Sequence, residues 1–230
     1  MRFLHRDTLA TAHGAVAVGF TEPLPIVADV SRARSTVLAD VAAATGRTPW
    51  VMHQVHGADL HVVGDDDVAD HPVLDVDALA TTRGDVALMA RAADCVPLLL
   101  ASPEGAVAAV CAGRRGLALG VVPQAVKRLR ELDATRLTAW IGPHICGRCY
   151  EVPQQMQEEV ASLVPASRST TSWGTPALDL GAGVRAQARG GGRRRRTRGR
   201  RLHARTTAGR PTAATATPPC ASPAWSGGES

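Results

Sequence analysis

The stretch from residue 96 to residue 132 reads VPLLLASPEGAVAAVCAGRRGLALGVVPQAVKRLREL. It begins with two apolar runs, Val96–Leu100 and Ala106–Val110, which flank the turn residues Ser102-Pro103-Glu104-Gly105. Such runs on both sides of a turn predict a pair of buried strands. The following residues, Gly116–Leu132, carry apolar side chains at helical spacing and predict an amphipathic helix, in which Pro123 introduces a kink or a break. Strands followed by a helix of this kind favour an α/β fold.

The same alternation of strands and helices continues on both sides of this stretch. A helix is predicted over Val30–Thr45, where Gly46 stops it, and a second over Gln154–Val164. Residues 50–63 predict a strand, a turn at His56-Gly57 and a second strand. The remaining apolar runs predict further strands at Ala15–Phe20, Val76–Thr81, Val86–Ala90 and Leu137–Ile141.

Composition excludes several classes of protein. The chain has 230 residues, of which 45% are hydrophobic, enough for one packed core. It contains no run of about 18 apolar residues, so no membrane-spanning helix is expected. The N-terminus is a poor secretory signal. The five cysteines are scattered, which argues against a disulfide scaffold and for a reducing cytoplasm. We therefore expect a cytoplasmic protein without a membrane partner.

The net charge of +5 belongs to the end of the chain. Residues 189–230 hold ten arginines and one glutamate, while residues 1–188 hold 16 basic and 20 acidic side chains. This Arg-rich and then Thr/Ala/Pro-rich tail has almost no large apolar side chain, so it is predicted to be disordered. No aromatic residues alternate with the arginines, and no specific nucleic-acid partner is expected.

Four short motifs carry chemistry, and each has an ordinary structural interpretation as well. His53 and His56 could bind a metal from a turn, or could be surface histidines. Cys95 beside Asp94 could be a nucleophile or a zinc thiolate, or a buried free thiol.

The other two motifs follow the same pattern. Arg114 and Arg115, at the start of a helix, could bind an anion or be solvated. The pair Cys146 and Cys149 could be a redox or zinc motif, but no second C-x-x-C exists and two incidental thiols are favoured.

Taken in order, these motifs resemble the YfiH-type laccase-domain family, whose members are also called multicopper polyphenol oxidases and purine nucleoside phosphorylases. The resemblance covers roughly residues 48–187 and rests on HQVHGADLHVV (53–63), DVDALATTRGDVALMARAADCVPLLL (75–100), CAGRRGLALGVV (111–122) and IGPHICGRCYEVP (141–153). It implies a single domain over residues 1–188, with an α/β/β/α arrangement of mixed sheets.

The resemblance also implies an activity and a set of site residues. The activity is the zinc-dependent phosphorolysis of adenosine, inosine and methylthioadenosine to the base and ribose 1-phosphate, together with adenosine deamination in some relatives. The implied zinc ligands are His56, Cys95 and Cys111. The implied catalytic residues are Arg115, which would hold phosphate, and three candidates for proton transfer: His53, Asp94 and His144.

The chain departs from the family pattern at several places. Position 111 is Cys where the family has His, position 114 is Arg where Trp is usual, and a loop is missing between Phe20 and Val30. These departures leave two alternatives open. One is a copper-dependent polyphenol oxidase, which is disfavoured because such enzymes need many His ligands and residues 1–188 hold only seven. The other is an inactive remnant that binds zinc or a nucleotide.

The tail also lacks the family's closing motifs, C-T, S-Y-R-R-D-G and a last strand. Codons of residues 210–216, read one frame out of register, permit Ser, Tyr, Arg, Arg, Asp and Gly in this order. We therefore predict one or more frameshifts after about Gln187.

Overall fold

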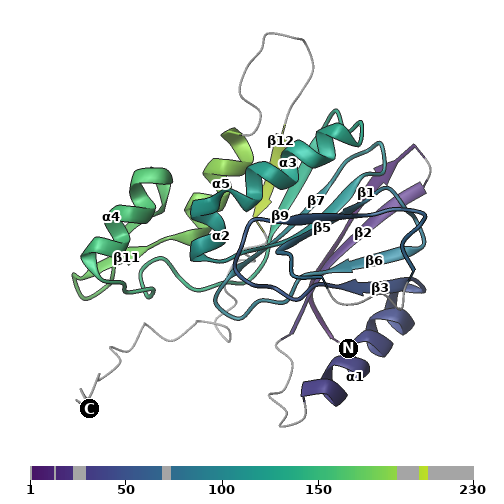
Figure 1. Cartoon of the computed structure of the whole chain (residues 1–230), viewed down its shortest axis with the longest axis horizontal. Coiled ribbons are helices and arrows are strands. Elements are labelled where there is room, and N and C mark those ends of the chain that lie inside the picture. Colours follow the sequence, from purple (N-terminus) through teal and green to yellow (C-terminus); the bar gives the residue numbers. More distant parts are fainter. Residues whose placement is uncertain (1, 13, 23–29, 69–73, 191–201, 207–230) are drawn as a thin grey trace.

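The computed structural model describes residues 2–12, 14–22, 30–68, 74–190 and 202–206. Its central element is a six-stranded mixed sheet with the strand order β12-β9-β7-β8-β5-β4 (Figure 1). The strands are β4 (Leu60–Val63), β5 (Ala78–Thr81), β7 (Val96–Ala101), β8 (Val107–Ala112), β9 (Leu137–Ile141) and β12 (Leu202–Thr206).

The two apolar runs of the 96–132 stretch form the middle of this sheet. Strands β7 and β8 pair antiparallel, and their connecting turn is closed by the Ser102 N–H, which donates to the Ala106 carbonyl at 2.9 Å. Strand β8 also pairs antiparallel with β5, and β7 pairs antiparallel with β9. The outer pairs, β4 with β5 and β9 with β12, are parallel. The predicted strand pair is therefore confirmed, and the sheet is mixed as expected.

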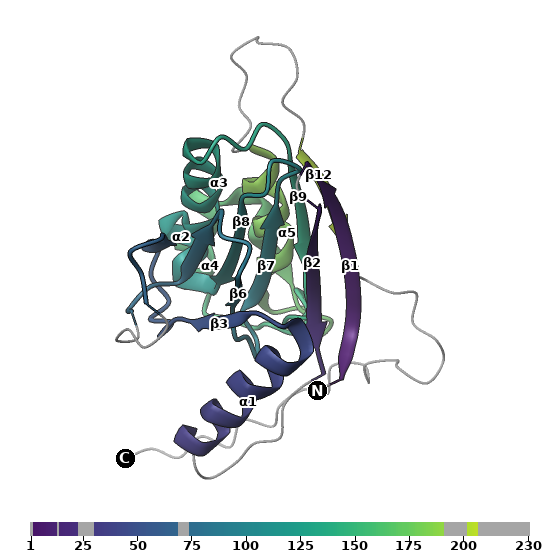
Figure 2. The same ribbon diagram turned by 90° about the vertical axis from the view of Figure 1, so that its right-hand side faces the viewer.

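Helices α2 (Arg114–Leu119), α3 (Val121–Glu131) and α5 (Leu180–Gly190) pack on one face of the sheet, and α4 (Gln154–Leu163) packs on α2 beside them (Figure 2). The apolar stripe of α3 is fully buried against β5 and β8, as its helical spacing predicts. A short antiparallel pair, β10 (Arg168–Thr170) and β11 (Pro176–Leu178), lies beside α4.

The opposite face is covered by two small sheets. The hairpin of β1 (Phe3–Thr11) and β2 (Gly14–Thr21) packs through Phe20 against Trp140 of β9. The Trp140 indole N–H also donates to Asp7 Oδ2 of β1 at 2.9 Å. The parallel pair β3 (Thr48–Val51) and β6 (Val86–Met89) packs on β4 and β5, with helix α1 (Val30–Thr45) outside it. Helices, sheet, sheets and helix thus give the expected α/β/β/α layers.

One prediction of local structure is wrong in detail. The helix predicted over Gly116–Leu132 is two helices, and the break lies at Gly120, whose φ of 86° is left-handed. Pro123 instead occupies the first turn of α3, where a missing N–H leaves no helical bond unmade. The two strands predicted within residues 50–63 are confirmed, and they join different sheets, because β3 pairs with β6 and β4 pairs with β5.

The tail is described only in part. Helix α5 extends to Gly190, and Leu202–Thr206 add a parallel strand to β9. Strand β12 was not predicted from the sequence, and it adds residues 202–206 to the edge of the central sheet. Residues 191–201 and 207–230, which the prediction of disorder also covers, lie outside the described residues. The same is true of residues 23–29, where the family loop is missing.

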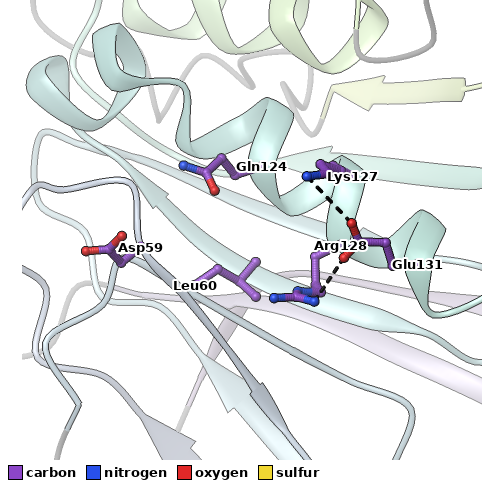
Figure 3. Close-up of a pocket in the computed structure, with 6 residues that line it drawn as sticks. All are labelled: Asp59, Leu60, Gln124, Lys127, Arg128 and Glu131. Atoms are coloured by element: carbon purple, nitrogen blue, oxygen red, sulfur yellow. Dashed lines mark hydrogen bonds and ion pairs between the residues drawn. The ribbon is translucent and has the colours of Figure 1, made fainter.

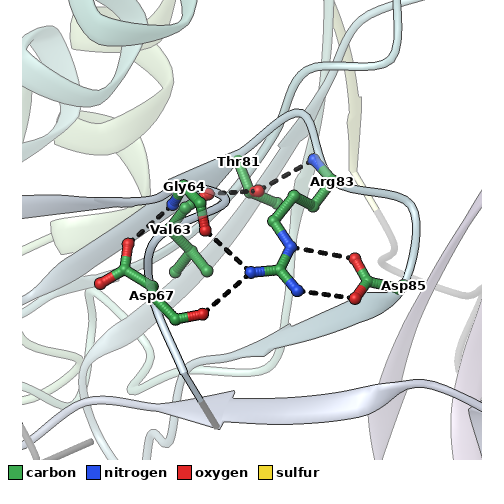
Figure 4. A network of polar contacts seen from close by, with 6 residues as sticks. All are labelled: Val63, Gly64, Asp67, Thr81, Arg83 and Asp85. Atoms are coloured by element: carbon green, nitrogen blue, oxygen red, sulfur yellow. Dashed lines mark hydrogen bonds and ion pairs between the residues drawn. The ribbon is translucent and has the colours of Figure 1, made fainter.

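One polar network fixes the loop after β4 to the β5–β6 turn (Figure 4). The Arg83 guanidinium donates to the carbonyl oxygens of Gly64 and Asp67 and to both carboxylate oxygens of Asp85. Thr81 Oγ1 donates to the Val63 carbonyl at 2.7 Å and accepts from the Arg83 N–H at 3.0 Å. The far ends of β4 and β5 are therefore held together by side chains.

None of the helices in the described ranges combines the length and the apolar character that are needed to cross a bilayer.

Candidate active site

The turn that carries His56 is held by a buried carboxylate. Asp77 directly precedes β5 and is fully buried. Its side chain accepts the backbone N–H groups of Val55, His56 and Gly57 at 3.3, 2.9 and 2.6 Å. His56 itself has a left-handed backbone, with φ of 57°, an unfavourable conformation for a residue with a Cβ. The predicted turn at His56-Gly57 therefore exists, and Asp77 stabilises it.

The two cysteines of the candidate site come from adjacent strands. Cys95 immediately precedes β7, and Cys111 lies near the end of β8, where it is 1% exposed. Because β7 and β8 are antiparallel and Pro97 pairs with Cys111, the start of one strand adjoins the end of the other. The Cys111 N–H also donates to the Asp77 carbonyl at 2.9 Å. The histidine turn and both thiols thus lie together at one end of the inner strands of the central sheet.

Two glycines allow helix α2 to approach the histidine turn and Cys95. A Cβ at Gly113 would lie 2.8 Å from both Cys95 Sγ and His56 Cδ2. A Cβ at Gly116 would lie 2.6 Å from the Gly57 carbonyl oxygen. Contacts this short cannot form without displacement of the neighbours. The Gly113 and Gly116 positions of the C-A-G-R-R-G motif are therefore required for close packing of the turn, Cys95 and the helix.

Cys95 and Cys111 influence each other's ionisation, and His56 influences that of Cys95. A hydrogen bond from Cys111, together with the neighbouring His56, lowers the pKa of the Cys95 thiol to about 6, although burial opposes this. The hydrogen bond to Cys95 and burial both raise the pKa of Cys111. At neutral pH this arrangement favours a Cys95 thiolate that accepts a hydrogen bond from a neutral Cys111 thiol.

The types of donor fit a zinc ion, which binds imidazole nitrogen and thiolate sulfur. Cys95 adjoins both His56 and Cys111, but within the described part of the chain no group of three His, Cys, Asp or Glu side chains has a geometry that could hold a metal ion. The residues of the predicted set are therefore neighbours without forming a finished coordination site.

His53 lies at the exposed side of the same segment. Its Nδ1 is 2.7 Å from Asp75 Oδ1, and the two residues also form an isolated parallel bridge. Next to it, the Gln54 amide donates to the Arg91 carbonyl at 2.6 Å and accepts the Arg91 N–H at 2.8 Å. The segment 53–57 is thus fixed at both ends, by Gln54 and by Asp77.

The other predicted catalytic residues lie on separate elements around the histidine turn and the two thiols. Arg115 is exposed on α2, two residues after Gly113. Asp94 precedes Cys95, and its carbonyl accepts the Ile145 N–H at 3.1 Å, so the 142–150 loop borders the start of β7.

His144 is directed toward α5 rather than toward the cysteines. Its Nδ1 is 2.7 Å from the Gly142 carbonyl, and its Nε2 packs so closely on Gly181 that a Cβ there would lie 2.2 Å away. Nδ1 is therefore engaged by the Gly142 carbonyl and Nε2 packs against Gly181 of α5, although the loop that carries His144 adjoins Asp94.

The C-x-x-C motif is not a disulfide pair. Cys146 has a free thiol, whereas Cys149 takes part in a disulfide bond. The prediction of two incidental thiols is therefore wrong for Cys149, and the two cysteines are not bonded to each other.

A separate open pocket of about 350 Å³ lies between the start of β4 and helix α3 (Figure 3). Its charged side chains bind one another, since Glu131 pairs with Lys127 at 3.7 Å and with Arg128 at 2.9 Å. None of the predicted site residues lines it. The candidate site is thus defined by the contacts of its residues and not by this pocket.

Sequence reasoning missed three residues that organise the site: Gln54, Asp75 and Asp77. The signal for Asp77 was present, because a carboxylate next to the apolar residues of a predicted buried strand must be hydrogen-bonded once it is buried. Gln54 and Asp75 lie within quoted motifs, but nothing in their spacing indicates which groups they would bind.

Fold and site together define a layered α/β domain that gathers histidine, cysteine and arginine at the ends of its central strands. The profile of the family described as multi-copper polyphenol oxidoreductase laccase matches residues 26–207. The chain therefore belongs to this laccase-like family, in agreement with the resemblance noted in the sequence.

Similar proteins include two from Streptomyces species. The chain is 54% identical over 144 residues to a purine nucleoside phosphorylase of Streptomyces coelicolor, a match that covers 61% of this chain and 59% of that protein. It is 52% identical over 139 residues to a purine nucleoside phosphorylase of Streptomyces griseus, covering 59% of this chain and 56% of that protein. The chain thus spans about three fifths of the length of these relatives.

Solved structures support the fold. YlmD from Geobacillus stearothermophilus matches with a TM-score of 0.59 and 28% identity, over 73% of this chain and 67% of that chain. YfiH from Bacillus licheniformis matches with a TM-score of 0.66 over 84% of this chain and 81% of that chain, at 22% identity.

Proposed function

We propose that the chain is a zinc-dependent purine nucleoside phosphorylase, which converts adenosine, inosine or methylthioadenosine and phosphate into the free base and ribose 1-phosphate. The single observation that supports this best is the grouping of His56, Cys95 and Cys111 beside the helix that carries Arg115. The 54% identity to a protein named for this activity supports it independently.

Phosphate would bind to Arg115. Helix α2 is only six residues long, so its backbone N–H groups contribute little, and the guanidinium is the main source of positive charge. Arginine suits this role because its planar fork pairs with two phosphate oxygens. A phosphate oxygen then attacks the anomeric carbon of the ribose, the bond from that carbon to the base nitrogen breaks, and the base accepts a proton.

His56, Cys95 and Cys111 would hold the zinc. When bound, the ion would polarise the substrate or a bound water. The low pKa of Cys95 favours this role, because zinc binds the thiolate and not the thiol. The second thiol at position 111 adds negative charge at the ion and lowers its strength as a Lewis acid in comparison with histidine.

Proton transfer to the leaving base is assigned to His53, Asp94 or His144. His53 has the most suitable surroundings, since a carboxylate binds its Nδ1 and its side chain is 62% exposed. A general acid must reach the reacting group, and the close packing of the His144 Nε2 on Gly181 makes that residue less suitable. The same residues could support deamination of adenosine, an additional activity that we include in the proposal.

We infer a cytoplasmic location, because three of the four cysteines among the described residues, at positions 95, 111 and 146, are free thiols, although Cys149 is disulfide-bonded. The expected partners are a purine nucleoside and phosphate.

The test is the release of adenine from adenosine by the purified full chain, with and without phosphate, combined with metal analysis. We expect phosphate-dependent adenine release and a zinc content near one per chain. Arg115→Met should raise the KM for phosphate, whereas Arg128→Met, which removes an exposed arginine of α3 that pairs with Glu131, should leave it unchanged. Copper with oxidation of phenols would instead support the laccase alternative. Zinc without adenine release would support the inactive remnant.

A further inference from the structure

A single residue links the two halves of the candidate site. The carboxylate of Asp77 accepts three consecutive backbone N–H groups of the 55–57 turn. Three N–H groups that converge in this way form a concave anion-binding nest. Asp77 is fully buried, so its side chain has no water to replace these donors, and the turn and the carboxylate depend on each other.

The backbone of the same residue is tied to the neighbouring strands. The Asp77 N–H donates to the Asp59 carbonyl at 3.0 Å, next to the start of β4, and the Asp77 carbonyl accepts the Cys111 N–H at 2.9 Å. The side chain therefore determines where His56 lies, and the main chain determines where Cys111 lies. Cys95 adjoins both residues, because its Sγ and His56 Cδ2 would each lie 2.8 Å from a Cβ at Gly113, and Pro97, two residues further along, pairs with Cys111.

The turn has a conformation that needs such support. With φ of 57°, His56 lies in the left-handed region, which residues with a Cβ avoid. In this conformation the N–H groups of residues 55, 56 and 57 point to the same side, toward Asp77. If the acceptor were lost, the turn would relax toward ordinary backbone angles, and the imidazole would move away from Cys95 and Gly113.

We propose that Asp77 is the positioning residue of the site, and that it sets the distance between His56 and the thiol pair by binding the 55–57 turn. Asp77 touches neither substrate nor metal and acts through His56. The proposal rests on the proposed function in one respect, namely that His56 is a ligand.

The matched variants are Asp77→Asn and Thr81→Val. Asn has the shape of Asp but keeps only one acceptor oxygen, so at least one N–H of the turn faces an amide NH₂ group. Thr81 lies at the other end of β5, is equally buried and makes two hydrogen bonds through Oγ1. Thr81→Val therefore removes polar contacts from the same strand without touching the turn.

Two measurements separate positioning from general destabilisation. The first is amide hydrogen exchange of the metal-free full chain, resolved at residues 55–57. The second is titration of the full chain with Zn²⁺ against a competing chelator. We expect faster exchange at 55–57 in Asp77→Asn alone, and an affinity for zinc that is lower by about 10–100-fold, the usual effect of removing the partners that orient a ligand. Thr81→Val should lower the melting temperature but leave both quantities unchanged.

Each result has a distinct meaning. If both variants lose stability while Asp77→Asn keeps wild-type exchange at 55–57 and wild-type zinc affinity, the positioning role is overturned. If the wild-type chain does not bind zinc, the proposed function fails, but the exchange measurement still decides whether Asp77 holds the turn. If Asp77→Asn does not fold, Asp77→Ser, which keeps one acceptor in a smaller side chain, takes its place in the same two measurements.

Discussion

The carboxylate of Asp75 binds the imidazole of His53, with Oδ1 2.7 Å from Nδ1. The side chains are 62% and 72% exposed, so the pair contributes little to stability. When Nδ1–H is donated to a carboxylate, Nε2 is left as the acceptor that can take up or return a proton. The arrangement therefore suits proton transfer at the surface of the site better than it suits structural support.

His53→Gln tests this role. Because a positioned acid or base contributes about 10²–10⁴-fold to rate, we expect kcat for adenine release to fall by roughly that range, with little change in the melting temperature. Asp75→Asn should have a smaller effect of the same sign, since the imidazole remains but loses its partner. If His53→Gln kept wild-type kcat, proton transfer would have to be assigned to Asp94 or His144.

Gly113→Ala should damage the site by steric conflict. The new Cβ would lie 2.8 Å from both Cys95 Sγ and His56 Cδ2, and overpacking of this kind typically costs about 1–3 kcal/mol. We expect a lower melting temperature and weaker zinc binding, measured by competition with a chelator. Gly84→Ala is the control, because nothing lies within 4 Å of a Cβ at Gly84. Equal zinc affinity in the two variants would show that His56 and Cys95 need no close approach to α2.

The parts of the fold that sequence predicts well are those with local causes. The β7–β8 pair follows from two apolar runs and a four-residue turn, and helix α1 has the predicted bounds because Gly46 ends it. The break at Gly120 also has a local cause, since glycine readily adopts a positive φ. The sequence pattern instead predicts a kink or a break at Pro123, three residues later, because proline usually interrupts a helix.

The parts that sequence does not predict depend on distant partners. Strands β3 and β4 have the expected composition, yet only the packing of the whole domain decides that they join different sheets. The polar sequence of β12 gives no strand signal, and its pairing with β9 compensates for weak propensity. At the site, the motifs predict that His56, Cys95 and Cys111 approach one another, but the hydrogen bonds that the 55–57 turn donates to Asp77 require two segments 20 to 22 residues apart to be in contact.

The thiol at position 111 provides a test of the metal site. Cys111→Ser keeps the shape of this buried side chain at a slightly smaller volume and removes a thiolate ligand, so zinc affinity should fall. Cys146→Ser, at an exposed free thiol outside the predicted ligand set, should leave it unchanged. Both affinities are measured by chelator competition. A wild-type affinity in Cys111→Ser would exclude Cys111 as a ligand.

Cys111→His should increase kcat for phosphate-dependent adenine release. Neutral imidazole withdraws less of the zinc's positive charge than a thiolate does, so the ion remains a stronger Lewis acid. The comparison uses wild-type and variant chains loaded with equal amounts of zinc, with the melting temperature recorded for each. Unchanged kcat at full zinc occupancy would show that the charge at position 111 does not limit turnover.

Finally, the ion pair of Arg83 and Asp85 should make stability dependent on pH in the acid range. The Arg83 guanidinium donates two hydrogen bonds to this carboxylate, at 3.0 and 2.7 Å (Figure 4), and holds the pKa of Asp85 below its ordinary value. A group with a lower pKa in the folded state stabilises the protein above its unfolded pKa, about 3.9 for Asp, and this contribution is lost as the pH falls through the folded value. Asp85→Asn should therefore have a lower melting temperature than the wild type by a constant amount from about pH 8 to pH 5, and the difference should shrink below about pH 4.

Asp66→Asn, at an exposed carboxylate of the loop that Arg83 binds, serves as the control for a change of charge alone. A difference between Asp85→Asn and wild type that stayed constant down to pH 3 would show that Arg83 holds the loop through the carbonyl oxygens of Gly64 and Asp67 and not through the charge of Asp85.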